Sequence, residues 1–489
     1  MLSWQGYRRL ALTLPSMCSV KLWPFGRSLV LSVGATWLMA SCDLAPRRPL
    51  ASVNLPASFA TAGPWRTAKP ADASPRGDWW QLFHDDRLSR LMQEAEQGSP
   101  TLDIARQRVL EARAMARADR AGLFPAATLR HTAQRDRATG SMQFQFAGGR
   151  TRTTLLNALD LDYEIDFWGR ISNQSRAGTA RGDAAEADAE NARLGLLSEM
   201  AMNYYALRLQ DAQLALLRRT VTVRQRTADL ARKRFAQGDV AQVDVAQAET
   251  DLAETQAEAI GLERDRAELE HAIALLLGKV PSEVRLPTLP LAGRPPNLPR
   301  AVPSTLLERR PDIAAAEREM SALNAEIGVA RAAYFPSMTL GLRGGTQTSF
   351  YDLMDNRSSL VWGLGPAGLE WPLLRGGRVR ANHVAAKARY EQSASRYRQT
   401  VLAAMREVED ALTGLDVLRR QSAAQDTTVS AASRALDLSQ KRYESGLVAY
   451  FEVLDAQRTL LRAEREATRL QGELFLATVM LVKALGGGW

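Results

Sequence analysis

The stretch LDLDYEIDF, residues 159–167, alternates apolar and acidic side chains along its whole length. Alternation with a period of two is typical of a β-strand that has one apolar face and one polar face. The same pattern returns in residues 338–342 and 360–364, where Met, Leu or Trp occupies every second position. About nine to eleven residues of such a strand cross a membrane. These segments therefore predict membrane-crossing strands, and we expect each half of the chain to contribute two.

The acidic residues of the first stretch fall on one side of the predicted strand. We expect a solvated polar face there, with the binding of a cation as the alternative. The four residues concerned are Asp160, Asp162, Glu164 and Asp166.

Two very long helices are predicted by residues 180–237 and 379–445, which contain no proline and are rich in Ala, Leu, Glu, Arg and Gln. Nearly sixty residues at 1.5 Å each give a helix of roughly 85–90 Å. Gly238 and Gly446 interrupt these runs, and a shorter helical stretch follows each glycine. Each half is therefore expected to contain a helical hairpin with a glycine at its tip. The second long helix has the heptad spacing of a coiled-coil seam at Val401, Met405, Val408, Leu412 and Leu415.

The chain consists of two copies of one plan. A shift of 211 residues carries residues 100–105 onto 311–316 and the Phe-Pro pair at 124–125 onto that at 335–336. A shift of 208 carries residues 233–238 onto 441–446. Two registers that differ by three residues indicate duplication with small changes of length. Each half is predicted to contain a medium helix, ended by Phe-Pro, then two strands and the long hairpin.

Boundaries follow from this plan. We expect a signal peptide, an N-terminal extended segment, a first repeat, a Pro-rich linker and a second repeat, at residues 1–41, 42–98, 99–280, 281–305 and 306–489.

The N-terminus is predicted to be a lipoprotein signal peptide. Arg8, Arg9, Lys21 and Arg27 precede an apolar run of about a dozen residues, too short to cross a bilayer. The sequence LMASC, ending at Cys42, resembles a lipobox, which predicts acylation of the Cys42 thiol. A chance cysteine after an ordinary signal peptide is the alternative. Asp43 follows and resembles the inner-membrane retention signal of enteric lipoproteins.

Composition and motifs give no sign of catalysis. The net charge of +9 falls to +5 without the first 41 residues, and the remaining basic residues are not clustered as nucleic-acid binding requires. The four histidines are far apart, and no zinc-protease, CxxC or P-loop motif is present. Residues 363–368 match GxGxxG, but we expect these glycines in a strand or turn. No enzyme activity, cofactor, metal or nucleic acid is expected.

Four strands cannot close a barrel, since even the smallest membrane barrels use about eight. If the strands enter a membrane, several copies of the chain must therefore combine, and the long helices would continue the barrel as a helical conduit.

Several segments, in order along the chain, resemble the TolC-like outer-membrane factors, most closely the NodT/OprM-type lipoproteins that serve resistance-nodulation-division (RND) efflux pumps. The segments are RRPDI at 309–313, AEIGVA at 325–330, YESGLVAYFEVLDAQ at 443–457 and ALGGGW at 484–489. The resemblance spans nearly the whole chain from Cys42 to Trp489.

This resemblance implies a mainly α-helical chain with a β-barrel part. It implies a homotrimer with a twelve-stranded barrel in the outer membrane, lipid-anchored and continued by a long periplasmic helical tunnel. It implies a passive duct for drugs or other toxic compounds, supplied by an inner-membrane RND-type pump and a periplasmic adaptor protein. No cofactor is implied.

The resemblance also implies roles for particular residues. The hairpin tips that contact the adaptor correspond to Gly238, Asp239, Val240, Gly446, Leu447 and Val448. The periplasmic gate corresponds to Phe451, Glu452, Asp455 and Arg458, and a latch between hairpins to Tyr443 and Asp244. The alternative is that Phe451 belongs to a coiled-coil core and that Glu452 and Asp455 are ordinary solvated charges.

Two other functions compete with the efflux duct. One is a duct for type I protein secretion. The other is a periplasmic coiled-coil lipoprotein that acts as a scaffold without a pore, against which the alternating strands argue.

Overall fold

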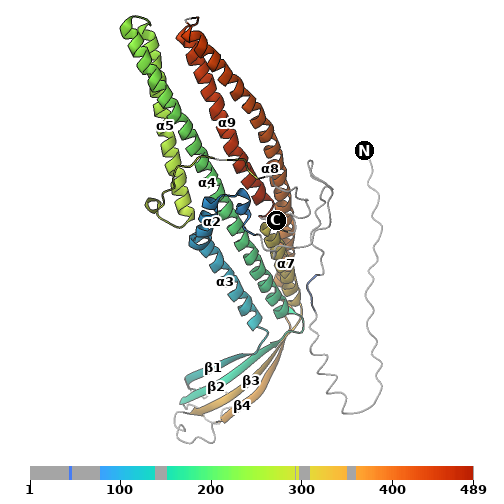
Figure 1. Ribbon diagram of the computed structural model, residues 1–489. Helices are drawn as coiled ribbons and strands as arrows, with labels where there is room; N and C mark the ends of the chain where they lie inside the picture. The colour runs from blue at the N-terminus through green and yellow to red at the C-terminus, as the bar shows by residue number, and fades with distance from the viewer. Residues whose placement is uncertain are drawn as a thin grey trace, which may run out of the picture. The chain divides into compact units, whose positions relative to one another are not determined.

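The computed structural model describes residues 43–46, 77–137, 151–291, 293–296, 309–349, 360–445 and 447–487. The predicted signal peptide, Cys42 and Gly446 lie outside these residues. Within residues 43–489 the strands lie together at one end of the long helices, and the hairpin tips lie at the other end (Figure 1).

Both halves contain the predicted helix, strand pair and helical hairpin, so the predicted fold class is confirmed. The short elements η1 (Trp79–Phe83) and α2 (Asp86–Gly98) precede the first half, and η2 (Pro281–Glu283) follows it. The first half contains α3 (Pro100–Ala121), β1 (Ala126–Arg137), β2 (Thr151–Ile165), α4 (Arg170–Gln237) and α5 (Gln242–Leu276). The second half contains α7 (Pro311–Ala332), β3 (Ser337–Ser349), β4 (Leu360–Glu370), α8 (Arg378–Glu444) and α9 (Tyr450–Ala484).

Helix α4 is longer than predicted, and α8 matches its predicted range to within one residue at each end. Helix α4 has 68 residues and α8 has 67, each about 100 Å at 1.5 Å per residue. The predicted start of α4 at residue 180 was wrong by ten residues. Gly169, with φ 70°, precedes α4, and Asp166 accepts hydrogen bonds from the free backbone N–H groups of Ile171 and Ser172. These contacts let the helix begin directly below the strand. None of the described helices is long and apolar enough to cross a membrane.

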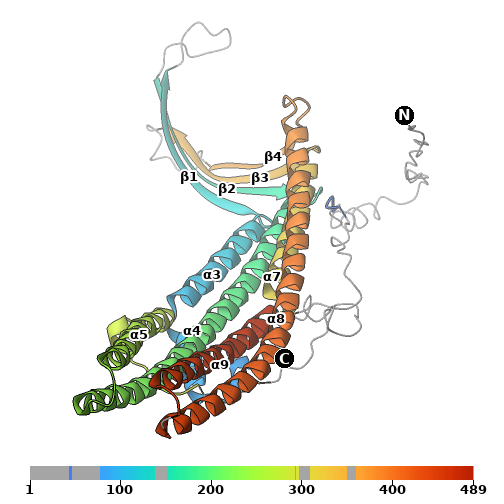
Figure 2. The same cartoon turned by 90° about the horizontal axis from the view of Figure 1, so that it is seen from above.

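The four strands form one antiparallel sheet in the order β1-β2-β3-β4, and Figure 2 shows them curving together. Leu129 lies opposite Leu159, Leu161 opposite Leu342, and Leu342 opposite Leu364. Near the helices, this face of the sheet is therefore largely apolar, and much of it is exposed. The GxGxxG segment lies inside β4, as predicted, at a β-bulge opposite residues 340–342.

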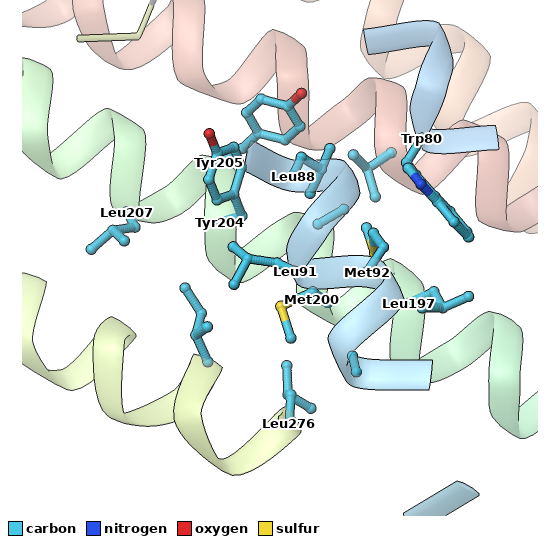
Figure 3. Packing of buried hydrophobic residues seen from close by; sticks show 14 of the residues in the cluster. Trp80, Leu88, Leu91, Met92, Leu197, Met200, Tyr204, Tyr205, Leu207 and Leu276 are labelled. Carbon is cyan, nitrogen blue, oxygen red and sulfur yellow. The ribbon is translucent and has the colours of Figure 1, made fainter. Parts of the chain in front are cut away.

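The largest core lies where α2 packs against the middle of α4 and the ends of α5 and α9 (Figure 3). Trp80, Leu88 and Met92 are fully buried against α4 residues such as Met200. The hydroxyl of Tyr204 donates a hydrogen bond to the carboxylate of Asp85, the residue that caps α2, with an O–O distance of 2.7 Å. The N-terminal segment is thus fixed to the centre of the long helix.

The predicted coiled-coil seam of α8 packs against the C-terminal part of α9. Val408 and Leu415 are buried, Met405 and Leu412 are half-buried, and all four belong to one cluster with α9 residues such as Leu481. The fifth seam residue, Val401, packs instead with Ile313 of α7. The heptad pattern therefore correctly predicted a stripe of α8 residues that packs against other helices, α9 for four of them and α7 for Val401.

Helices α4 and α7 cross at small residues near the strand end. A Cβ added to Gly328 of α7 would lie 2.7 Å from the amide carbon of Asn173 in α4. Asn173 cannot move freely, because it is buried and donates a hydrogen bond to the Gly169 carbonyl at 2.7 Å.

We predict that Gly328→Ala destabilises the protein by about 1–3 kcal/mol, because the added methyl overpacks this crossing. Gly261→Ala is the matched control, since Gly261 lies on an exposed part of α5 and an added methyl would meet no atom within 4 Å. That change should be neutral or stabilise by up to about 1 kcal/mol. Thermal unfolding in detergent, followed by circular dichroism, measures both, and equal midpoints for the two variants would contradict the crossing argument.

Candidate gate and channel-lining sites

The polar face of the sheet carries a cluster of charges rather than the predicted solvated acids. Asp160 of β2 is 4% exposed. Its carboxylate accepts hydrogen bonds from Arg130 of β1 at 2.9 Å and from Arg343 of β3 at 2.5 Å. The expectation of a solvated face was therefore wrong at Asp160, because basic residues on both neighbouring strands reach across the ladder to it.

The other acids of this stretch tie the strands to α4. Glu164 forms a bidentate ion pair with Arg170, with distances of 2.8 and 2.6 Å. Asp166 lies just beyond β2 and caps α4. Asp162 lies opposite Ala126 on the polar face. Within the described ranges, no group of three or more His, Cys, Asp or Glu residues is placed to hold a metal ion.

The predicted hairpin tips are short turns. Gly238 has φ 83° and ends α4 in the left-handed conformation that glycine adopts easily. Asp239 is exposed and Val240 half-buried, and in the second tip Leu447 is exposed and Val448 half-buried. The tips therefore expose the charged Asp239 and the apolar Leu447, and each valine is partly covered.

The first turns of α9 carry the predicted gate residues. Phe451 is 57% exposed, and Asp455, one turn further, is also exposed, so the two share one open face. Phe451 thus lies outside the core of the single chain. Glu452 is exposed, and its carboxylate lies 3.7 Å from Arg442 of α8.

Arg458 connects the two hairpins. Its guanidinium binds Asp251 of α5 at 2.6 and 3.2 Å, and this hydrogen-bonded partner raises the Arg458 pKa. Asp251 is 2% exposed, and Arg224 of α4 donates to its backbone carbonyl at 2.6 Å. Seven residues further along each helix, Arg465 and Glu258 form a second pair at 2.5 Å.

Asp251 is a residue of this site that the sequence patterns did not predict. The signal that could have found it is its place beside the buried stripe of α5, where a carboxylate needs a cationic partner. The stripe consists of Ala248, Leu252, Thr255 and Ala259.

The predicted latch residues line one cavity near the tips. Tyr443 of α8 and Asp244 of α5 both border a cavity of about 260 Å³ between the hairpins. The hydroxyl of Tyr443 accepts a hydrogen bond from Arg234 of α4, whose guanidinium also lies 5.1 Å from the ring centroid. The Asp244 carboxylate instead accepts the N–H of Ala241 at 3.2 Å. The direct partner of Tyr443 is therefore Arg234.

The residues directly after Cys42 contact the body of the protein. Asp43 forms an ion pair with Arg176 of α4 at 2.5 Å, and Asn324 of α7 donates to the Pro46 carbonyl at 3.0 Å. Partial burial opposes ionisation of Asp43. The Ala45 N–H and the Arg176 guanidinium outweigh it and hold the pKa of this carboxyl below its usual value.

An apolar sheet that continues into helical hairpins of about 100 Å defines a class of protein, the channel subunit of an outer membrane with a large periplasmic part. Comparison with known proteins agrees. The sequence pattern of the outer membrane efflux protein family matches residues 91–279 and 302–487. The chain belongs to this family, and it is an outer-membrane efflux channel protein.

Individual relatives are similar over most of their length. Outer membrane protein OprJ of Pseudomonas aeruginosa is 32% identical over 92% of this chain and 94% of its own. Pyoverdine export outer membrane protein OpmQ of Pseudomonas putida is 33% identical over 86% of this chain and 90% of its own. A crystal structure of CusC superposes with a TM-score of 0.80 at 28% identity, covering 91% of this chain and 100% of that chain.

We predict that Arg458→Ala destabilises the packing of α9 against α5 by about 1–3 kcal/mol, because buried Asp251 loses its cationic partner. Thermal unfolding should show the loss, and the conductance of the closed channel should rise. Arg462→Ala, one turn further along α9 at an exposed position, is the control. A variant at Arg458 that behaves like the one at Arg462 would contradict this assignment.

Proposed function

We propose that three copies of the chain close a twelve-stranded barrel and form a passive efflux duct across the outer membrane and periplasm. The observation that carries this proposal is the sheet of four strands, which has one largely apolar face and, among the described residues, no partner strand at either edge. Such edges cannot remain open in a bilayer, because no water satisfies their N–H and C=O groups there. The match to the outer membrane efflux protein family supports the same assembly.

We propose that Phe451, Glu452 and Asp455 form the periplasmic gate. Threefold repetition would place a ring of phenyl groups beside a ring of carboxylates at the narrow end of the helices. The apolar ring excludes water, and the acidic ring favours cations. The exposure of Phe451 and Asp455 on one face of α9 supports this role.

In the same scheme the pairs between α9 and α5 act as the latch. Arg458–Asp251 and Arg465–Glu258 repeat at a seven-residue interval and hold the two hairpins of one chain together. Because Asp251 is buried, the first pair costs more to separate than an exposed pair. Tyr443 and Arg234 add a contact nearer the tips. Opening of the duct would require these contacts to change.

Two partner proteins are expected from the resemblance to the same family. We propose that a periplasmic adaptor contacts the tip residues Gly238, Asp239, Val240, Gly446, Leu447 and Val448, and that an RND-type inner-membrane pump supplies energy and cargo. Relatives are named for pyoverdine export, cation efflux and toluene efflux. Cargo this varied favours a duct for small compounds over type I protein secretion.

We propose that Cys42 carries the lipid anchor. Asp43 is docked on Arg176, so the residue next to the anchor is held against α4. This contact gives the Asp43 carboxylate a structural use that is independent of lipoprotein sorting.

The proposed duct is tested by conductance. We predict that the purified protein forms heat-modifiable trimers and conducts in planar bilayers, and that Glu452→Ala with Asp455→Ala raises the conductance and lowers the cation selectivity. The reason is the loss of the acidic ring at the constriction. A wild-type protein that never conducts would favour the scaffold, and unchanged conductance in the double variant would count against the gate.

The anchor has its own test. We predict that Cys42→Ser abolishes acylation, because no other cysteine follows the signal peptide in the sequence. Incorporation of radiolabelled palmitate measures it, with the wild type as control. Label retained in the variant would place the lipid elsewhere.

A further inference from the structure

The outer edges of β1 and β4 have no partner strand within the described sheet. We propose that β4 of one copy pairs with β1 of the next in one particular register, with Glu370 directly opposite Arg130. Glu370 of the neighbouring copy then completes the charge cluster of Arg130, Asp160 and Arg343. This inference rests on the proposed trimer and adds the register of its seams.

The internal duplication determines this register, because equivalent residues of the two halves are separated by a constant number of residues. Strand β1 begins at Ala126 and β3 begins at Ser337, so equivalent residues of these strands are 211 apart. Ala126 lies opposite Asp162, and Ser337 lies opposite Glu370, so equivalent residues at the base of β2 and β4 are 208 apart. Gly169 and Gly377, the left-handed residues before α4 and α8, give the same shift of 208 independently.

The seam between the two repeats is visible inside one chain, where β2 pairs with β3. There Leu161 lies opposite Leu342, Asp162 opposite Gly341, and Tyr163 opposite Leu340. A seam between copies is the same join, with β4 in the place of β2 and β1 in the place of β3.

Adding 208 to the β2 residues and subtracting 211 from the β3 residues transfers the register to the seam between copies. The transferred pairs are Leu369 with His131, Glu370 with Arg130, and Trp371 with Leu129. Beyond the bulge in β4 the register shifts by one residue, so the transfer applies to the end of the strands nearest the helices.

The side-chain faces agree with the transferred register. Leu129 is 79% exposed and Trp371 is 59% exposed, although both are large and apolar. Leu129 lies on the apolar face of the sheet, opposite Leu159. Trp371 directly follows the last residue of β4, two residues after Leu369, so continued alternation would place it on the same face. A slip of one residue would place Trp371 opposite Arg130 or Thr128, on the wrong face.

The charges agree as well. In one chain, Arg130 and Arg343 both bind Asp160, so two cations share one buried anion. Glu370 lies on the same polar face, and its only described partner is Arg375 at 2.7 Å. A neighbouring Glu370 would bring a second carboxylate beside the two guanidinium groups that share Asp160. Opposite charges placed directly across an antiparallel pair are favourable.

Disulfide cross-linking tests the register directly. Residues opposite each other in an antiparallel pair have Cα atoms about 4.5–5.5 Å apart, within the range of a disulfide. Glu370→Cys combined with Arg130→Cys should give covalent dimers and trimers on non-reducing gels after mild oxidation of outer membranes. The control, Trp371→Cys with Arg130→Cys, is one residue out of register with its side chains on opposite faces, and it should stay monomeric.

A charge exchange gives a second readout. Glu370→Arg or Arg130→Glu alone should lower the temperature at which the trimer dissociates in SDS, and the double exchange should recover most of the loss. Asp162→Arg, the repeat equivalent of Glu370 within the chain, should not be rescued by Arg130→Glu.

The outcomes separate this inference from the proposed function. A trimer that conducts, but that cross-links better in the control pair or shows no rescue in the double exchange, would overturn the register and leave the duct standing. A purified wild-type protein that is monomeric by native mass spectrometry would overturn the duct itself.

Discussion

Every part of this structure depends on the need to satisfy backbone hydrogen bonds inside a membrane. The described sheet of one chain pairs β1 with β2, β2 with β3 and β3 with β4, and it contains no further strand. In water the two open edges would cost little, but in hydrocarbon each unpaired N–H or C=O costs several kcal/mol. This cost is the physical reason for the proposal that several copies of the chain close the sheet together. In the proposed assembly, closing the sheet would enclose a lumen, and the helices attached to the strands would continue the same ring.

Much of this could be predicted from the sequence, since the decisive patterns are local. Alternation in residues 159–167 marks a strand, and the heptad steps in α8 mark a contact with α9 that the structure confirms. Boundaries were less predictable. The start of α4 at Arg170 depends on the Asp166 cap and on Gly169 in the left-handed conformation, which the composition of the helix does not show.

The site residues were harder to predict, because their partners are remote in sequence. Arg458 was expected at the gate, but its partner Asp251 lies 207 residues away, and only the packing of two hairpins brings them together. Tyr443 likewise bonds to Arg234 across 209 residues. The acids of β2 looked solvated because Arg130 and Arg343 stand on other strands. The gate and tip assignments remain predictions drawn from the family.

In the proposed trimeric ring, the seam within a chain and the seam between copies differ in one aromatic contact. Inside the chain, Trp168 stacks on Phe335 with centroids 4.4 Å apart and donates to the Pro336 carbonyl at 2.9 Å. The shift of 208 places Gly376 where Trp168 stands, and the shift of 211 places Phe124 where Phe335 stands. A seam between copies therefore lacks the indole that closes the seam within a chain. The stacked contact of Trp168 and Phe335 is thus particular to the seam inside the chain, and the proposed seam between copies does not repeat it.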